Sequence, residues 1–171
     1  QLSREVEPDI ALTTDIMVGF PGEDEAAYSE TLSLVEHVGF SRLHVFPYSE
    51  RPGTSARQLP RSVPMRVRRA RARQVRALGK RLAAAYMERS VGEVLPVLWE
   101  QRLDEGAWRG LTDTYLEVRT MDARPLYNGV TPTHIVGTGP AHLVGEIAAE
   151  HSALQRSTGV AVVSHARLER S

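Results

Sequence analysis

Two short loops in this chain contain residues that could bind a ligand. The first, GFPGE at residues 19–23, follows an apolar segment, and its glycines let the backbone approach a ligand closely. The second, YSERPGTSA at residues 48–56, contains a Pro-Gly turn beside Arg51 and close to Arg57, whose guanidinium groups suit phosphate. The two loops indicate a site for an anionic or nucleotide ligand, although GFPGE alone is more often a tight strand–helix turn.

Three further side chains near these loops are candidates for ligand contact. Asp15 lies in the otherwise apolar segment ALTTDIMVGF, where a carboxylate needs a partner or a ligand because burying an unpaired charge is costly. Phe46 and Tyr48 should point to the same side of a short strand, where they either stack on a base or an adenine ring or fill the core.

The six histidines show no pair with the i, i+4 spacing of a helical metal site, and no G-x-S-x-G or Walker loop indicates hydrolysis.

The pattern around the two loops predicts strand, helix, strand. Residues 11–20 are apolar and β-branched without alternation, which is typical of a strand buried on both faces in a parallel sheet. Acids at 23–25 favour the first turn of a helix, and Gly39 suits the position after its end. Residues 42–48 form a second short strand. In a right-handed βαβ unit both strands end at the same edge, so we expect both loops on one rim.

A long basic helix should follow these loops. The formal net charge of the chain is zero, but residues 1–50 carry −8, residues 51–89 carry +11 and residues 90–171 carry −3. Pro64 opens a helix whose apolar stripe continues to about Arg89. Its cations are either contacts for nucleic-acid phosphates or the solvated face of a helix in an arginine-rich protein. The candidates for phosphate contact are Arg68, Arg69, Arg76 and Lys80.

Beyond Arg89 the apolar period changes to two. VGEVLPVLWEQ, TDTYLEVRTM, PTHIVGT and AHLVGEIA indicate short strands, which together predict a small antiparallel β-barrel. Tyr115 and Arg119 should alternate onto one face of their strand, as a stacking and phosphate-binding pair, unless Tyr115 fills a gap in the barrel. Residues 150–171 lack a core pattern apart from VAVV at 160–163, so we expect a loosely ordered tail.

Composition places the chain among ordinary globular proteins. Its hydrophobic fraction is 42% and its charged fraction 25%, and no apolar run approaches the roughly 18 residues of a membrane span. Without a secretory signal, a cytoplasmic location is the default.

The chain begins at Gln1, and one βαβ unit cannot cover both faces of its strands, so we expect a fragment with further strands upstream. It contains no cysteine, which excludes disulfides, zinc fingers and cysteine-ligated iron–sulfur clusters within it.

These motifs resemble a known family. TDIMVGFPGE and FPYSERPGTSA, with the segment between them, resemble the second half of the radical S-adenosylmethionine domain of tRNA methylthiotransferases. The next helix and VGEVLPVLWE…WRGLTDTYLEV resemble that family's linking helix and its C-terminal TRAM domain, a small RNA-binding β-barrel. The resemblance covers about residues 10–148. LHVFPYS and GLTDTYLEV are most similar to the branch that acts on N6-threonylcarbamoyladenosine beside the anticodon, whereas Glu50 departs from the proline usual in its loop.

The resemblance implies an α/β plus β fold with two parts and a connecting helix. Residues 1–62 would be the C-terminal part of a parallel (β/α) partial TIM barrel, followed by a basic linking helix at 63–89. Residues 90–149 would be a TRAM-like RNA-binding β-barrel, and residues 150–171 a tail.

The resemblance also implies tRNA as the partner, together with the missing N-terminal part of the same protein, and neither membrane nor DNA. The complete enzyme would use S-adenosylmethionine and two 4Fe–4S clusters, whose cysteines lie upstream. No catalytic residue and no metal ligand is therefore expected in this chain. The implied contacts to S-adenosylmethionine are Asp15, Gly19, Phe20, Gly22, Phe46 and Tyr48. The implied RNA contacts are Arg51, Arg57, Arg68, Arg69, Arg76, Lys80, Tyr115 and Arg119.

Two other functions fit the same residues. A free-standing RNA-binding module could be built from the basic helix and the barrel, and a start codon just upstream of Gln1 would favour it. A methylthiotransferase that modifies an aspartate of a ribosomal protein is the related alternative, against which the YSER sequence and the Arg-Pro-Gly loop argue. An upstream reading frame with a CxxxCxxC run would favour the tRNA-modifying enzyme.

The absence of cysteine generates a direct prediction. After anaerobic reconstitution with iron and sulfide, the isolated chain should hold no stoichiometric 4Fe–4S cluster and should not cleave S-adenosylmethionine, because it offers no thiolate ligands. Iron analysis and the visible absorption of the cluster measure the first property, and chromatography for 5′-deoxyadenosine measures the second. Stoichiometric cluster assembly on this chain would contradict the prediction.

Overall fold

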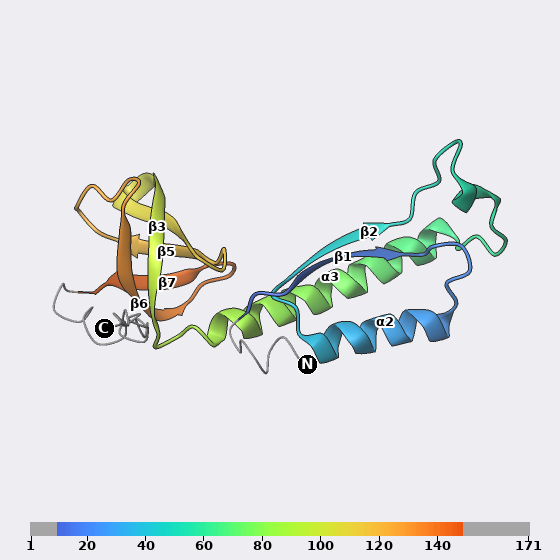
Figure 1. Ribbon diagram of the computed structural model, residues 1–171, viewed down its shortest axis with the longest axis horizontal. Coiled ribbons are helices and arrows are strands. Elements are labelled where there is room, and N and C mark those ends of the chain that lie inside the picture. The colour runs from blue at the N-terminus through green and yellow to red at the C-terminus, as the bar shows by residue number, and fades with distance from the viewer. Residues whose placement is uncertain (1–9, 149–171) are drawn as a thin grey trace, which may run out of the picture.

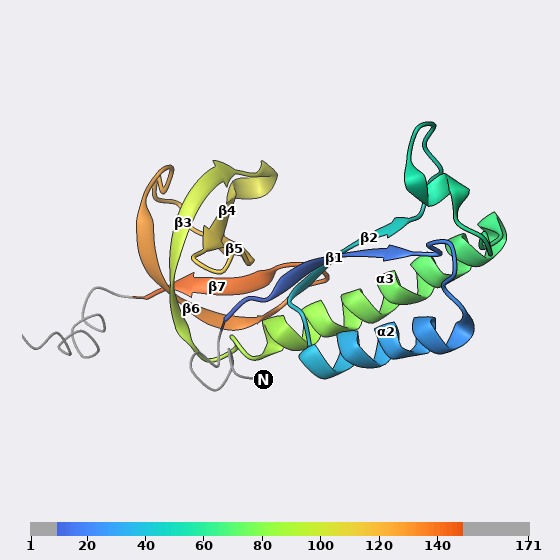
Figure 2. The same cartoon turned by 45° about the vertical axis from the view of Figure 1, so that its right-hand side comes forward.

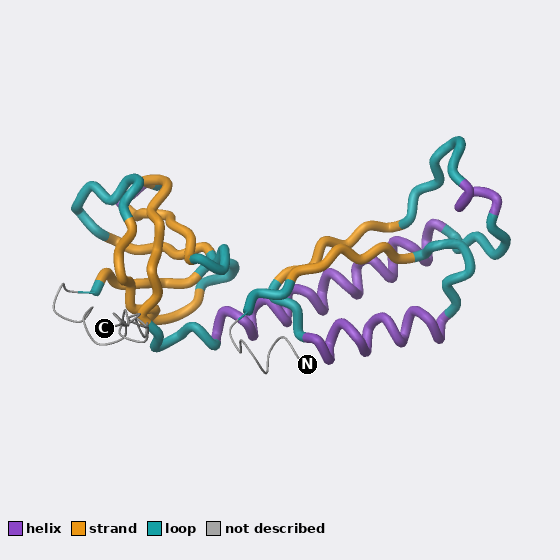
Figure 3. The backbone as a smooth tube through the Cα atoms, viewed as in Figure 1, coloured by secondary structure: helices purple, strands orange, loops and turns teal. Residues whose placement is uncertain are grey.

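The computed structural model describes residues 10–148, which form two parts joined by one helix (Figure 1). The tail expected at 150–171 lies outside the described residues. The α/β part contains β1 (Thr13–Val18), α2 (Glu25–Val38), β2 (Arg42–Pro47) and the 3₁₀ turn η1 (Ser55–Gln58). Helix α3 (Met65–Glu88) then leads to the barrel, as Figure 3 shows by secondary structure. The barrel contains β3 (Val94–Arg102), η2 (Asp104–Gly106), β4 (Ala107–Thr112), β5 (Glu117–Met121), β6 (Val130–Thr138) and β7 (Leu143–Ile147).

The predicted strand–helix–strand unit is confirmed. Strands β1 and β2 pair in parallel, from Thr13 opposite Arg42 to Val18 opposite Pro47. Asp24 caps α2 by accepting a hydrogen bond from the Ala27 N–H at 2.9 Å, and Gly39 ends the helix in the left-handed conformation with φ of 64°.

Only one face of this two-stranded sheet is covered. Helices α2 and α3 both lie on that face (Figures 1 and 2), where Ile16 and Val18 are buried. On the opposite face Met17 and Phe46 remain 54% and 50% exposed. The prediction of a strand buried on both faces is therefore wrong for this chain, because the structure describes no third strand beside β1 and β2.

Within residues 10–148, neither α2 nor α3 is apolar over a sufficient length to cross a membrane.

The C-terminal part is a closed barrel with the strand order β3-β4-β5-β7-β6. Its core includes Trp99, Trp108 and Ile135. The predicted antiparallel arrangement holds for every pair except β5 and β7, which run parallel. Sequence periodicity missed β4 because a glycine, Gly110, occupies one of its inward positions. A Cβ atom there would lie 2.6 Å from the Leu98 carbonyl oxygen, so the crowded interior excludes a larger residue.

A buried arginine fastens α3 to the first rim loop. Arg71 forms an ion pair with Glu23, donates a further hydrogen bond to the Glu23 carbonyl at 3.0 Å, and reaches Glu25 at 3.0 Å. Its guanidinium group also lies 4.7 Å from the centre of the Tyr28 ring. Burial opposes its charge, but the hydrogen bonds to the two glutamates outweigh burial and raise the pKa of Arg71 above its usual value.

A second buried arginine fastens α3 to the second rim loop. Arg68 donates to the carbonyl oxygens of Val63 at 2.7 Å and Tyr48 at 3.0 Å, and to the Ser62 hydroxyl at 2.9 Å. It also pairs with Glu50 at 3.1 Å. Both loops are thus held by the same turn of helix.

These contacts predict unequal roles for two arginines of α3. Changing Arg71 to Met should lower the free energy of unfolding by about 3–5 kcal/mol, because Glu23 would be left as a buried, unpaired charge. Changing Arg81 to Met should cost less than about 1 kcal/mol. The Arg71 and Glu23 side chains are 7% and 12% exposed, whereas Arg81 and its partner Glu36 are 71% and 62% exposed.

Urea unfolding of the full chain, followed by the far-ultraviolet circular dichroism of its helices, measures both values. Equal losses of unfolding free energy for Arg71→Met and Arg81→Met would contradict the prediction that the Arg71 contacts stabilise the fold more than the Arg81 pair does.

Candidate functional site

The two motif loops meet on one rim, as predicted. The Gly22 N–H donates to the Arg61 carbonyl at 3.0 Å, and the Tyr48 N–H donates to the Val18 carbonyl at 2.8 Å. The rings of Phe20 and Tyr48 meet edge to face with centres 5.2 Å apart. The parallel direction of β1 and β2 brings the loops together, since both follow the carboxyl ends of their strands.

The backbone of GFPGE forms hydrogen bonds within the chain. The Gly19 N–H donates to the Glu23 carboxylate at 2.7 Å, so this amide is occupied by the chain's own acid. Gly19 has φ of 75°, and a side chain there would clash with Arg68. The interpretation of GFPGE as a tight strand–helix turn therefore accounts for Gly19, while Gly22 (φ 91°) has open space beside its Cα atom.

The other predicted cofactor contacts separate into exposed and buried residues. Asp15 is exposed on the uncovered face of β1, so the expectation that this carboxylate is buried is wrong for this chain. Phe46 is 50% exposed on the same face, whereas Tyr48 is 5% exposed. The two rings do not share a side because β2 ends at Pro47, after which strand alternation no longer holds. The Tyr48 hydroxyl is buried without a hydrogen-bond partner among the described residues.

The uncovered face of β1 and β2 carries both polar and apolar side chains. Cross-strand partners on it are Asp15 with His44 and Met17 with Phe46, so two polar side chains lie beside an apolar pair. This combination fits S-adenosylmethionine in part. The chain does not fit an iron–sulfur cluster, because it has no cysteine. Between residues 10 and 148, no three His, Asp or Glu side chains come together as a group that could hold a metal ion.

The predicted RNA contacts do not form a single surface. Arg51 and Arg57 are exposed in the loop between β2 and α3, at the end of the α/β part that lies away from the barrel (Figure 1). Arg69 is exposed on α3. Arg68 is only 4% exposed, and the contacts described above occupy its guanidinium group. Its assignment as an RNA contact is therefore corrected, because helical spacing alone could not show that this cation faces inward.

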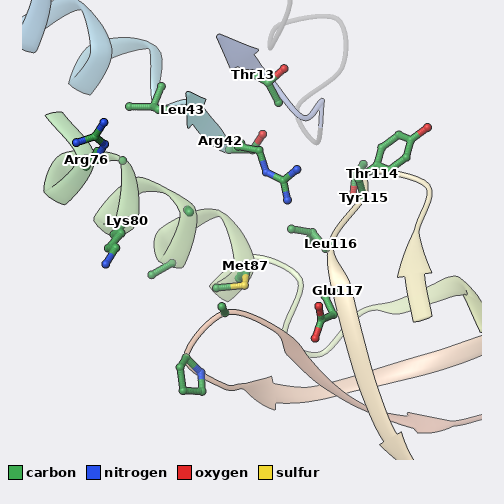
Figure 4. A pocket seen from close by; sticks show the side chains of 16 residues that line it. Thr13, Arg42, Leu43, Arg76, Lys80, Met87, Thr114, Tyr115, Leu116 and Glu117 are labelled. Carbon is green, nitrogen blue, oxygen red and sulfur yellow. The ribbon is translucent and has the colours of Figure 1, made fainter. Parts of the chain in front are cut away.

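Three other predicted contacts lie on the barrel side of the rim. Arg76 and Lys80 from α3 and Tyr115 from the barrel are among the residues that line one groove of about 620 Å³. Figure 4 shows the Arg76 and Lys80 side chains extending from the side of α3 away from the loop that carries Tyr115. Arg42, at the start of β2, also lines the groove and extends toward the loop that carries Tyr115. Sequence reasoning missed Arg42, although it is one of only two basic residues in positions 1–50. Arg76 additionally donates to the Val45 carbonyl at 2.7 Å.

Tyr115 lies in a loop rather than in a strand. The predicted strand TDTYLEVRTM is divided between the end of β4, a loop, and β5, so Tyr115 and Arg119 do not share a strand face. Tyr115 is 73% exposed. Arg119 is exposed on β5 and pairs with Glu117 at 2.8 Å.

The pKa of the His142 imidazole is lowered, because the side chain is partly buried and lies near the positive charge of Arg119.

Known proteins similar to this chain act on tRNA. A threonylcarbamoyladenosine tRNA methylthiotransferase of Thermotoga maritima is 39% identical over 67% of this chain and 26% of its own length. A tRNA-2-methylthio-N(6)-dimethylallyladenosine synthase of Wolinella succinogenes is 37% identical over 81% of this chain and 32% of its own length. A second threonylcarbamoyladenosine enzyme, from Bacillus subtilis, is 33% identical over 81% of this chain and 32% of its own.

The chain thus spans about a quarter to a third of the length of these relatives. No protein-family model matches it. The relatives include both nucleoside types at similar identity, so the comparison does not separate the two branches. The homologues of this chain are tRNA methylthiotransferases.

Proposed function

We propose that this chain is the C-terminal portion of a tRNA methylthiotransferase that modifies N6-threonylcarbamoyladenosine next to the anticodon. The observation that carries the proposal is the 33–39% identity to methylthiotransferases across 67–81% of the chain. The closed five-stranded barrel, joined through one long helix to a parallel βαβ unit, is consistent with a TRAM-like module attached to an α/β domain.

The uncovered face of β1 and β2 supports a larger α/β domain. Half-exposed Met17 and Phe46 on a two-stranded sheet need covering, and upstream strands of a partial TIM barrel would place this face inside. Asp15 and Phe46 would then line the S-adenosylmethionine site beside the rim residues Phe20 and Gly22. The buried Tyr48 hydroxyl without a partner is consistent with a missing polar group at this rim. Both 4Fe–4S clusters would be held entirely by residues outside this chain.

The choice of the threonylcarbamoyladenosine branch rests on LHVFPYS at 43–49 and GLTDTYLEV at 110–118. The first motif covers β2 from Leu43 onward and opens the rim loop that would face the modified nucleoside. The second contains the exposed barrel loop with Tyr115. Both motifs therefore lie on surfaces that we assign to ligand contact.

The proposal predicts a defined modified nucleoside. The complete reading frame that contains this chain, expressed in a bacterial strain lacking its own methylthiotransferases, should restore 2-methylthio-N6-threonylcarbamoyladenosine in tRNA. Liquid chromatography with mass spectrometry of tRNA digests measures this nucleoside. The same reading frame without residues 10–148 is the matched control and should restore nothing.

The two alternative results have different meanings. Formation of the 2-methylthio derivative of dimethylallyladenosine instead would refute the branch and retain the enzyme class. Absence of both nucleosides, with the protein expressed and its clusters loaded, would refute the proposed function.

A further inference from the structure

We propose that the outer face of strands β3 and β6 is a docking surface for the C-terminal segment of this chain, and that the apolar run at 160–163 covers it. This surface, called here the β3–β6 face, consists of Val94, Pro96 and Leu98 on β3 and of Val130 and Pro132 on β6. The inference concerns a contact within the chain, so it goes beyond the proposed function and does not depend on it.

The outward positions of β3 and β6 are apolar where a barrel usually carries polar side chains. Alternation along β3 turns Val97 and Trp99 into the core. It leaves Val94 and Leu98 on the outside, where they are 50% and 38% exposed. Val130, the partner of Leu98 on β6, is 63% exposed. Because the solvent side of such a strand is normally polar, this cluster of apolar side chains indicates a surface that another segment covers.

The register of the two strands makes the β3–β6 face continuous. Pro96 pairs with Pro132 and Leu98 pairs with Val130, so apolar side chains from both strands lie beside one another. The barrel is closed, so a covering segment finds no free strand edge at this face. Such a segment must therefore bind through contacts between side chains.

The last described residue lies beside the β3–β6 face. The Ala148 N–H donates to the Pro132 carbonyl at 2.9 Å, which continues the pairing of β7 with β6. The segment 149–171 therefore starts next to this face. Val160 is the twelfth residue after Ala148, and twelve residues span at most about 40 Å. The β3 part of the face is only about 13 Å long, so the apolar run can reach all of it.

Charge also favours this occupant over a nucleic acid. Glu100 on β3 and Glu146 on β7 are exposed on the outside of the barrel, and neither forms an ion pair with a described residue. Residues 149–171 carry three arginines and two acids, a formal net charge of 3 − 2 = +1. Arg156 precedes the apolar run and Arg167 follows it. A face with apolar side chains and unpaired acids disfavours a phosphate backbone and suits an apolar segment flanked by arginines.

Covalent attachment makes a small contact sufficient. A run of four apolar residues binds weakly as a separate molecule, but a segment of the same chain acts at an effective concentration of about 1 mM. A second copy of the chain would have to bind at its much lower concentration in solution. The segment that follows Ala148 is therefore the occupant that the geometry favours most.

The test measures how strongly the β3–β6 face is protected from a reagent in the full chain. The chain has no cysteine, so Val130→Cys introduces a single thiol on the face, and mass spectrometry follows its labelling by a maleimide. Val160→Ser combined with Val162→Ser removes apolar contacts of the segment. We expect this pair of changes to raise the labelling rate of the introduced thiol by about 3- to 10-fold, because the uncovered fraction of the face rises by that factor.

Met121 provides the matched control. It is 70% exposed on β5, a strand that pairs with neither β3 nor β6. The thiol introduced by Met121→Cys should be labelled at the same rate with and without the two serine changes. Near-ultraviolet circular dichroism, which reports the buried Trp99 and Trp108, establishes for each variant that the barrel is retained.

Two results would overturn the assignment. An equal labelling rate of the Val130→Cys thiol with and without the serine changes would show that residues 160–163 do not cover the face. Protection that increases with protein concentration would assign the face to a second copy of the chain instead.

Discussion

The ion pair between Arg71 and Glu23 is the contact on which the α/β part depends most. A parallel pair of strands covered on one face has limited apolar area to hold it together, and the described residues supply no third strand. Glu23 simultaneously accepts from the Gly19 amide, so one carboxylate closes the first rim loop and attaches it to α3. Arg71 Nη1 and Nη2 and Glu23 Oε2 all have partners, which offsets the cost of burying the charges, whereas the buried Arg71 Nε has none among the described residues.

Helix α3 uses arginine for two purposes along its length. Near its N-terminus, Arg68 and Arg71 turn inward and hold the rim loops. Farther along the helix, Arg76 donates to the Val45 carbonyl at 2.7 Å and so attaches α3 to β2. Arg71 and Arg76 are five residues apart on the helix, about 7.5 Å along its axis, so the two roles lie on neighbouring turns.

Two surfaces of the chain differ in their chemistry. The uncovered face of β1 and β2 exposes apolar side chains, which need apolar cover. The groove between α3 and the barrel is lined by cations, including Arg42 and Lys80, and by Tyr115.

Local sequence patterns determined the elements of the α/β part and α3, whereas the tertiary structure decided the division of the barrel strands and which residues meet. Acids after GFPGE and a glycine at position 39 were sufficient to place α2, and the apolar stripe was sufficient to place α3, because these signals act within a few residues. Periodicity could not show that Arg68 points inward, or that a loop interrupts the strand expected around Tyr115. It also could not find the groove, whose residues Arg42, Lys80 and Tyr115 come from segments far apart in the chain. Local propensity reports the backbone of one segment, whereas burial and strand pairing are decided by contacts between segments.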